Sequence, residues 1–222
     1  MRCKLSVGLL AMATLMGTAL AQSNIDPAHK FAWGENIGWT NWYDAGAPPG
    51  DQGVVVGRTF LSGFIWAENA GWINVGDGSP VNGVSYANLN GDDFGVNIQP
   101  ATDALYGYAW GENIGWVNFT GGSLAAPPNP ARIDGTRLRG YVWGENVGWI
   151  NLDGDADFVG LLPCDPCDAN CDGSINGGDI GWFIDLLNGV GTPCSRCAGD
   201  TNADGSINGS DISNFIDCLN AP

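Results

Sequence analysis

Residues 31–41 read FAWGENIGWTN, and variants of this eleven-residue motif recur at 64–74, 108–118 and 141–151. In each copy an aromatic residue and a tryptophan alternate along the chain before a turn of the form Gly/Ala-Glu-Asn-x-Gly. A second tryptophan and an asparagine alternate after the turn. Such alternation on both sides of a turn is typical of a β-hairpin, because successive side chains of a strand point to opposite faces. The motif therefore predicts four hairpins within residues 31–152.

The spacing of the copies indicates an internal repeat. Their leading tryptophans lie 33, 44 and 33 residues apart, which suggests duplication of a two-unit block. Short apolar stretches at 53–56, 94–98 and 131–134 precede three of the units and predict a third strand for each. These features indicate an all-β repeat domain of antiparallel hairpins. The pattern does not choose between a stacked and a radial array.

Both faces of the hairpins are rich in apolar residues. One face carries the motif tryptophans, and the other carries apolar residues such as Ile73 and Val75 on the return strand. We therefore expect the hairpins to be covered on two sides, with most of the ten tryptophans filling the core. The functional alternative is that exposed rings, with neighbouring amides, stack on sugar rings.

Four motif glutamates raise the question of catalysis, because glycosidases use paired carboxylates. A residue present in every unit more often serves the fold of the unit, whereas an active site usually occurs once per domain. We expect a structural role for these glutamates and for the motif asparagines, whose side chains would satisfy backbone groups. The residues concerned are Glu35, Glu68, Glu112 and Glu145, and Asn41, Asn74, Asn118 and Asn151.

Other catalytic devices have little support. His29 is the only histidine, and the sequence contains no G-x-S-x-G motif, phosphate-binding loop or HExxH motif. The chain therefore reads as non-catalytic, and glycoside hydrolysis is the one enzyme class left open.

Residues 1–21 are predicted to be a signal peptide. Arg2 and Lys4 precede an uncharged apolar stretch, and Ala19-Leu20-Ala21 forms a small-x-small cleavage site. A transmembrane anchor is the alternative, but the stretch is short and lacks a stop-transfer flank.

The formal net charge of −16 disfavours nucleic-acid and anionic-membrane partners and favours divalent cations. We expect a secreted protein, extracellular or at the cell surface, without a membrane span.

Cys3 lies in the predicted signal peptide, and the other six cysteines all lie in the last 59 residues. They are Cys164, Cys167, Cys171, Cys194, Cys197 and Cys218. An even number in a small exported module indicates a disulfide framework, with about 15 possible pairings. The two C-x-x-C pairs could alternatively hold zinc.

We divide the chain into the signal peptide, a lead-in (22–30), the repeat domain (31–152), an acidic linker (153–163) and a C-terminal module (164–222).

The C-terminal module contains two twelve-residue loops, 32 residues apart, with oxygen-bearing side chains at positions 1, 3, 5, 9 and 12 and glycine at position 6. Calcium takes six to eight hard oxygens around such a turn, and position 7 contributes its main-chain carbonyl. The predicted ligands of two calcium ions are Asp168, Asn170, Asp172, Ser174, Asn176 and Asp179 in loop one, and Asp200, Asn202, Asp204, Ser206, Asn208 and Asp211 in loop two.

Each loop runs into a short predicted helix with apolar residues spaced i, i+3, i+4 and i+7. These residues are Ile180, Phe183, Ile184 and Leu187, and Ile212, Phe215, Ile216 and Leu219. No helix is predicted before either loop, because Pro166 and Pro193 interrupt those segments. Two loops with exiting helices resemble a type I dockerin over the whole module.

The resemblance implies two calcium ions, a pseudo-twofold pair of helices and docking to a cohesin or another surface-anchoring protein. The implied pseudo-twofold arrangement would place loop one near helix two, which favours the disulfide Cys171–Cys218. The cysteines are similar to those of cysteine-bearing dockerin variants at the C-termini of exported proteins. Cellulosomal dockerins carry Ser-Thr at positions 10 and 11 and basic residues at 17 and 18, whereas this module has Gly177-Gly178 and Gly209-Ser210, then Ile184-Asp185 and Ile216-Asp217.

The repeats at 31–152 resemble repeats of exported bacterial proteins that have no known activity. Two hypotheses follow from the sequence. The first is a non-catalytic structural or ligand-binding protein, attached through its calcium-dependent module. The second is a component of a polysaccharide-degrading complex, either a glycoside hydrolase or a carbohydrate-binding module, docked to a cohesin.

Overall fold

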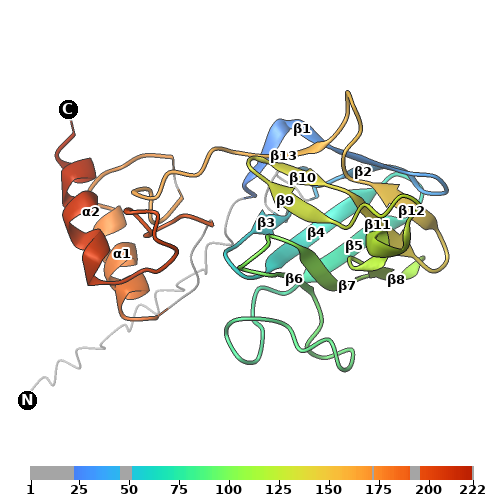
Figure 1. Cartoon of the computed structure of the whole chain (residues 1–222), viewed down its shortest axis with the longest axis horizontal. Coiled ribbons are helices and arrows are strands. Elements are labelled where there is room, and N and C mark those ends of the chain that lie inside the picture. The colour runs from blue at the N-terminus through green and yellow to red at the C-terminus, as the bar shows by residue number, and fades with distance from the viewer. Residues whose placement is uncertain (1–22, 46–51, 172, 191–195, 222) are drawn as a thin grey trace, which may run out of the picture.

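The computed structural model describes residues 23–45, 52–171, 173–190 and 196–221. Figure 1 shows a β-barrel and, beside it, a small module with two helices. The predicted signal peptide lies outside the described residues. Among the helices of the described segments, none is both long and apolar enough to cross a membrane.

The four motif copies form the four hairpins of a closed barrel (Figure 1). The hairpin strands are β1 (Ile25–Gly34) with β2 (Gly38–Asn41), β4 (Leu61–Ala67) with β5 (Gly71–Gly76), β7 (Leu105–Gly111) with β8 (Gly115–Asn118), and β11 (Tyr141–Gly144) with β12 (Gly148–Asn151). Neighbouring hairpins pair antiparallel through β2–β4, β5–β7 and β8–β11, and β12 pairs with β1. This last pairing closes an eight-stranded barrel, so the array is radial.

The hairpins share one register. The motif tryptophans face each other across every hairpin, as in Trp33 opposite Trp39. A pair of glycines closes three of the turns, and Ala67 with Gly71 closes the turn of the second hairpin. The glycine that ends each turn has positive φ, between 71° and 79°, which explains why glycine occupies this position in every copy: Gly38, Gly71, Gly115 and Gly148. The sequence prediction of four hairpins is confirmed.

A ring of hydrogen bonds joins the four turns at one end of the barrel. In each turn the asparagine after the motif glutamate donates from Nδ2 to a main-chain carbonyl in the turn of the adjacent hairpin. These bonds are Asn36 to Val147, Asn69 to Ile37, Asn113 to Ala70 and Asn146 to Ile114, at 3.1–3.3 Å. Each turn is therefore fixed to its neighbour, and the ring closes with the barrel.

The barrel interior is filled by layers of side chains, to which every hairpin contributes equivalent residues. The four layer pairs across the hairpins are Ala32 with Thr40, Ile65 with Ile73, Ala109 with Val117, and Val142 with Ile150. All eight of these residues are buried. A second layer contains Trp42 and Phe119, whose rings meet edge to face at 6.3 Å. The interior therefore has the close packing of a core and is no channel.

The expectation that tryptophans fill the core is wrong for the eight motif residues. Their side chains lie on the outer face of the barrel, where seven are exposed and Trp149 is half-buried. Trp42 alone among the described tryptophans is buried, at 1% exposure. The reason is closure, because a barrel of hairpins encloses only one face of its sheet. The opposite, tryptophan-rich face needs no covering layer.

Five further strands extend the sheet: β3 (Val55–Val56), β6 (Val96–Ile98), β9 (Arg132–Asp134), β10 (Arg137–Arg139) and β13 (Val159–Leu161). A short 3₁₀ helix, η1, spans Gly121–Leu124. Three of these strands fall on the three predicted additional strands. The expected lead-in and acidic linker are partly strand, since β1 begins at Ile25 and pairs with β13. The apolar run within 158–162 adds to the sheet despite its acidic surroundings.

The C-terminal module contains α1 (Asp179–Leu187), the 3₁₀ turn η2 (Gly209–Asp211) and α2 (Ile212–Leu219). Its buried core consists of Cys167, Ala169, Phe183, Leu186 and Phe215. The rings of Phe183 and Phe215 stack at 3.9 Å with an interplanar angle of 12°. The predicted fold class, an all-β repeat domain followed by a small α-helical module, is confirmed.

Candidate metal-binding and docking site

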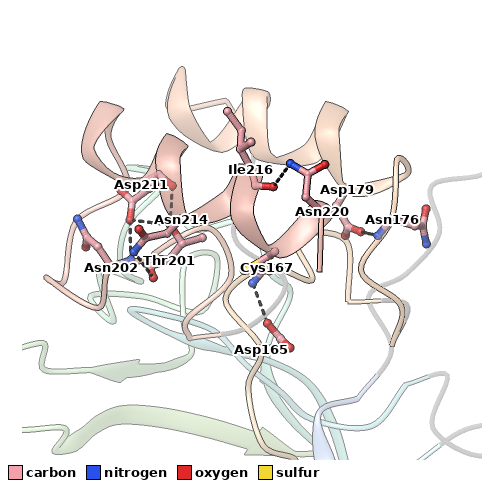
Figure 2. The surroundings of a disulfide bond; sticks show 11 residues. Asp165, Cys167, Asn176, Asp179, Thr201, Asn202, Asp211, Asn214, Ile216 and Asn220 are labelled. Atoms are coloured by element: carbon pink, nitrogen blue, oxygen red, sulfur yellow. Dashed lines mark hydrogen bonds between the residues drawn. A yellow bond between two sulfur atoms is a disulfide. The ribbon is translucent and has the colours of Figure 1, made fainter. Parts of the chain in front are cut away.

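Loop two, residues 200–211, is described throughout. The main-chain N–H of Gly205 donates to Asp200 Oδ2 at 3.0 Å, and that of Asn202 donates to Asp211 Oδ1 at 3.2 Å. The other carboxylate oxygen of Asp211 accepts from the N–H of Asn208 at 2.9 Å. The Asp211 carboxylate thus joins the start of the loop to its end (Figure 2).

Loop one repeats this arrangement at equivalent positions. Gly173 N–H donates to Asp168 Oδ2 at 2.9 Å, Asn170 N–H to Asp179 Oδ1 at 3.2 Å, and Asn176 N–H to Asp179 Oδ2 at 2.9 Å. Asp172, the predicted ligand at position 5, lies outside the described residues.

The backbones of the two loops also match. Position 4 is left-handed in both, with φ of 55° at Cys171 and 58° at Ala203. Position 6 is glycine with φ of 85° in loop one and 87° in loop two. Left-handed φ is uncommon for residues other than glycine, so its occurrence at the same position of both loops indicates one shared loop conformation.

The carboxylates at position 12 are held most tightly. Asp179 and Asp211 are both fully buried. Each begins the exiting helix, and Asn208 and Asp211 form a reciprocal capping box. A buried carboxylate is costly unless it is hydrogen-bonded or bound to a cation. These two are well placed to serve as fixed oxygen ligands.

The residues present fit a hard cation. At its predicted ligand positions each loop offers only carboxylate, amide, hydroxyl and main-chain oxygens, which suit calcium better than softer metals. No group of three or more His, Cys, Asp or Glu side chains in the described residues forms a metal centre by itself. Amide and carbonyl oxygens are therefore needed to complete six to eight ligands.

The cysteines form disulfides. Cys164 pairs with Cys197, and Cys167 pairs with Cys218. Cys171 is disulfide-bonded as well, whereas Cys194 lies outside the described residues. The favoured pair Cys171–Cys218 is wrong, because Cys167 on the segment before loop one is the residue that reaches helix two. The zinc alternative fails for Cys164, Cys167 and Cys197, since their sulfurs are already bonded.

The two disulfides hold the segments that precede loop one and loop two. Cys164–Cys197 joins the segment before loop one to that before loop two, where Gly199 N–H also donates to Pro166 O at 2.8 Å. The N–H of Cys167 donates to Asp165 at 2.9 Å (Figure 2). These links hold the segments where an EF-hand would have its entering helices.

The helix faces differ from the sequence prediction. Phe183 and Phe215 are buried as expected, but the four predicted core isoleucines are 42–49% exposed: Ile180, Ile184, Ile212 and Ile216. Trp182 is also exposed, at 49%. The small core contains Phe183, Leu186 and Phe215, with the predicted Leu187 and Leu219 partly buried against it, and the isoleucines are left on the open surface. The isoleucines occupy matched positions in the two helices, and this repetition is the sequence feature that could have indicated a shared exposed face.

A model of the dockerin type I domain family matches residues 166–220. Residues 166–220 form a dockerin type I domain. A dockerin domain implies docking to a cohesin-containing partner, and dockerin-bearing proteins are extracellular. The match does not extend to the barrel. No curated protein and no solved structure matches the chain.

The dockerin domain also contacts the barrel. Arg58, between β3 and β4, lies with Nη2 3.4 Å from Asp200 Oδ2 and donates to the carbonyl of Gly205. Arg196 pairs with Asp103 of the barrel. A guanidinium of the barrel thus lies against Asp200, the first predicted ligand of loop two.

In the barrel, the motif asparagines do what the sequence predicted. Each accepts a main-chain N–H two residues further on, at 2.8–3.1 Å: Asn41 from Tyr43, Asn74 from Gly76, Asn118 from Thr120 and Asn151 from Asp153. The four motif glutamates are all exposed beside the turns, at equivalent places around the barrel. They do not single out one pair of carboxylates as a catalytic centre.

Proposed function

We propose that this protein is a secreted, non-catalytic attachment protein whose dockerin domain docks the β-barrel to a cohesin-containing partner in the presence of calcium. The matched conformation of the two loops carries the proposal. Both loops use the same hydrogen bonds at positions 1 and 12 and the same left-handed backbone at positions 4 and 6.

Two calcium ions would bind, one per loop. Their ligands would be Asp168, Asn170, Asp172, Ser174, Asn176 and Asp179, and Asp200, Asn202, Asp204, Ser206, Asn208 and Asp211. Serine would contribute its main-chain carbonyl, and the asparagine at position 9 would act through water. Calcium supplies the charge that lets the carboxylates of each loop approach one another. The chain's own part is to hold Asp179 and Asp211 at the helix starts, so that binding fixes the direction of both helices.

The docking surface would be apolar. Ile184 and Ile216 stand at position 17, where cellulosomal dockerins carry basic residues, and both are exposed. With Ile180, Ile212 and Trp182, five large apolar side chains of the two helices are exposed, and exposed apolar surface of this kind is typical of interaction sites. The fitting cohesin would present an apolar surface to the helices rather than an acidic one.

Binding to recombinant cohesin domains encoded in the same genome tests the proposal. The mature full-length chain is expected to bind at least one of them in calcium and to lose binding in EDTA. The double variant Ile184→Asp/Ile216→Asp should abolish capture while two calcium ions remain bound by native mass spectrometry. Capture unaffected by EDTA, or by the double variant, would contradict the proposal, as would failure of every cohesin to bind the calcium-loaded chain.

The second candidate function is a component of a polysaccharide-degrading complex. The exposed tryptophans on the outer face of the barrel favour it, because indole rings stack on sugars. A binding role suits these observations better than hydrolysis, since the motif glutamates are equivalent in the four hairpins.

A further inference from the structure

A groove runs along the outside of the barrel between the first and second hairpins. It has a volume of about 450 Å³ and is lined by Phe31, Trp39, Asn41, Trp66, Glu68 and Asp157. Trp39 and Trp66 are 38% and 41% exposed. A pocket of this size can accommodate a small organic ligand.

The pairing of β2 with β4 builds the floor of this groove. Asn41 lies opposite Trp66 in the register, and Glu68 donates its N–H to the carbonyl of Trp39 at 3.0 Å. Trp39 and Trp66 are therefore diagonal neighbours on one face of the sheet, each beside a polar side chain. The result is a two-by-two pattern in which indole rings and polar groups alternate.

Both rings are held in place by the hairpins that carry them. Trp39 meets Trp33 at 4.9 Å and Phe31 at 6.2 Å, and Trp66 meets Trp72 at 4.9 Å, in edge-to-face contacts. Rings fixed in this way lose little conformational freedom when a ligand stacks on them. The floor is therefore preorganised.

The polar groups divide into a fixed one and two exposed ones. The Asn41 side chain is engaged with Tyr43, with the main-chain N–H of Asp44 and with the Asp44 carboxylate. Glu68 and Asp157 are exposed carboxylates that line the groove. Each ionised carboxylate accepts two or more hydrogen bonds and donates none. The groove therefore suits a ligand with an apolar face and several hydroxyl donors.

We propose that this groove is a binding site for neutral, pyranose-containing glycans. A pyranose ring has a face of C–H groups that stacks on an indole, and its hydroxyls can reach the carboxylates beside the ring. Glu68, Asp157 and the net charge of −16 disfavour uronates and sulfated sugars. A quaternary ammonium ligand is the rival chemistry, because aromatic rings and carboxylates also attract cations.

We call the pairing of adjacent hairpins a seam and number the seams β2–β4, β5–β7, β8–β11 and β12–β1. The same alternation of tryptophan and polar side chains recurs at the second, third and fourth seams. Asn74 lies opposite Trp110, Asn118 opposite Trp143 and Asn151 opposite Trp33. Asp157 lies only at the first seam, and at the third seam Phe94 packs on Trp116 at 5.2 Å. The first seam is therefore the principal subsite, and the others could lengthen contact with a polymer.

The proposal deepens the second candidate function and is independent of calcium and cohesin. The test is a titration of the mature chain, in calcium and in EDTA, with soluble β-glucan, xylan and mannan, and with polygalacturonate and choline as anionic and cationic probes. Binding of a neutral glycan that is equal in both buffers is the expected result, whether or not any cohesin binds. Binding of none of the neutral glycans, or of choline or polygalacturonate in their place, would overturn the proposal.

Matched variants locate the site. Trp39→Ala is expected to weaken binding about tenfold, as for a central aromatic contact. Trp116→Ala, at the equivalent position under Phe94, should change it less than about twofold. Glu68→Gln and Asp157→Asn keep the shape of the groove and should each weaken binding about threefold. Equal loss in Trp39→Ala and Trp116→Ala, or unchanged binding in both carboxylate variants, would place the glycan elsewhere. Circular dichroism confirms that each variant is folded.

Discussion

The barrel and the dockerin domain solve the problem of stability in different ways. The barrel contains a core of 28 buried residues and closes its hydrogen bonding through β12 and β1. The dockerin domain has a hydrophobic core of five buried residues and is cross-linked by disulfides. A large core can offset the entropy of ordering the chain, whereas a core of five residues cannot. In the dockerin domain, covalent links, together with the proposed calcium ions, would therefore do what packing does in the barrel.

Removing calcium tests this contrast most strongly. In the oxidised chain, EDTA should remove most of the helical circular dichroism at 222 nm, and EDTA with a reductant should remove all of it. The near-ultraviolet signal of the paired barrel tryptophans should remain. The disulfides should reduce the response to EDTA, because each such link raises the free energy of the unfolded state by about 3 to 4 kcal/mol. Helicity unchanged by EDTA, with no calcium detected by native mass spectrometry, would remove the distinction between the two regions.

Within the barrel, the contrast between the two faces predicts the next largest effect. Trp42→Ala removes a buried indole and should lower the free energy of unfolding by about 3 to 5 kcal/mol. Trp33→Ala removes an exposed ring and should cost only the edge-to-face contact with Trp39, about 1 kcal/mol. Urea denaturation in EDTA measures both. Equal losses would show that the outer aromatic face is as much a part of the core as the inner one.

On the dockerin domain, Trp182→Ala separates docking from folding. Trp182 is 49% exposed, and truncation of an aromatic anchor at an interface often costs 2 kcal/mol or more. We expect cohesin capture to weaken at least about tenfold while calcium affinity and melting temperature stay unchanged. Trp33→Ala on the barrel is the matched control. Unfolding of Trp182→Ala would assign this residue to the core, and unchanged capture would place the docking surface elsewhere.

A smaller effect is expected where the two regions meet. The guanidinium of Arg58 lies 3.4 Å from Asp200 and would repel the calcium ion proposed for loop two. Arg58→Met should therefore raise the calcium affinity of loop two about two- to threefold, and less so at high salt. Calorimetry on chains whose first loop carries Asp168→Ala isolates this site, with Arg132→Met as the control. Weaker calcium binding in Arg58→Met would mean that Arg58 supports the loop instead.

The smallest effect is predicted for the motif glutamates outside the groove. Glu112→Gln should change the free energy of unfolding by no more than about 0.5 kcal/mol, because the side chain is exposed. Binding or hydrolysis of any glycan should also be unaffected. If this change abolished an activity that survived substitution of its three equivalents, the barrel would be an enzyme.

Local patterns determined much of this protein from sequence alone. The alternation around each Gly/Ala-Glu-Asn-x-Gly turn gave the hairpins, since side chains two apart share a strand face and positive φ selects glycine. The twelve-residue spacing specified the two loops, whose hydrogen bonds and left-handed positions match in the structure, and the calcium ligands that it indicates stay a prediction. Both are short-range properties, in which a few neighbouring residues fix the backbone.

Tertiary structure decided what depends on residues far apart in the chain. Nothing near residue 33 indicates that β12, more than a hundred residues later, closes the barrel and leaves the tryptophan face outside. The pairing of Cys167 with Cys218 and the exposure of Ile184 and Ile216 depend likewise on where two short helices cross. Each periodic pattern marks an apolar face, but whether that face is covered depends on which distant segment packs against it.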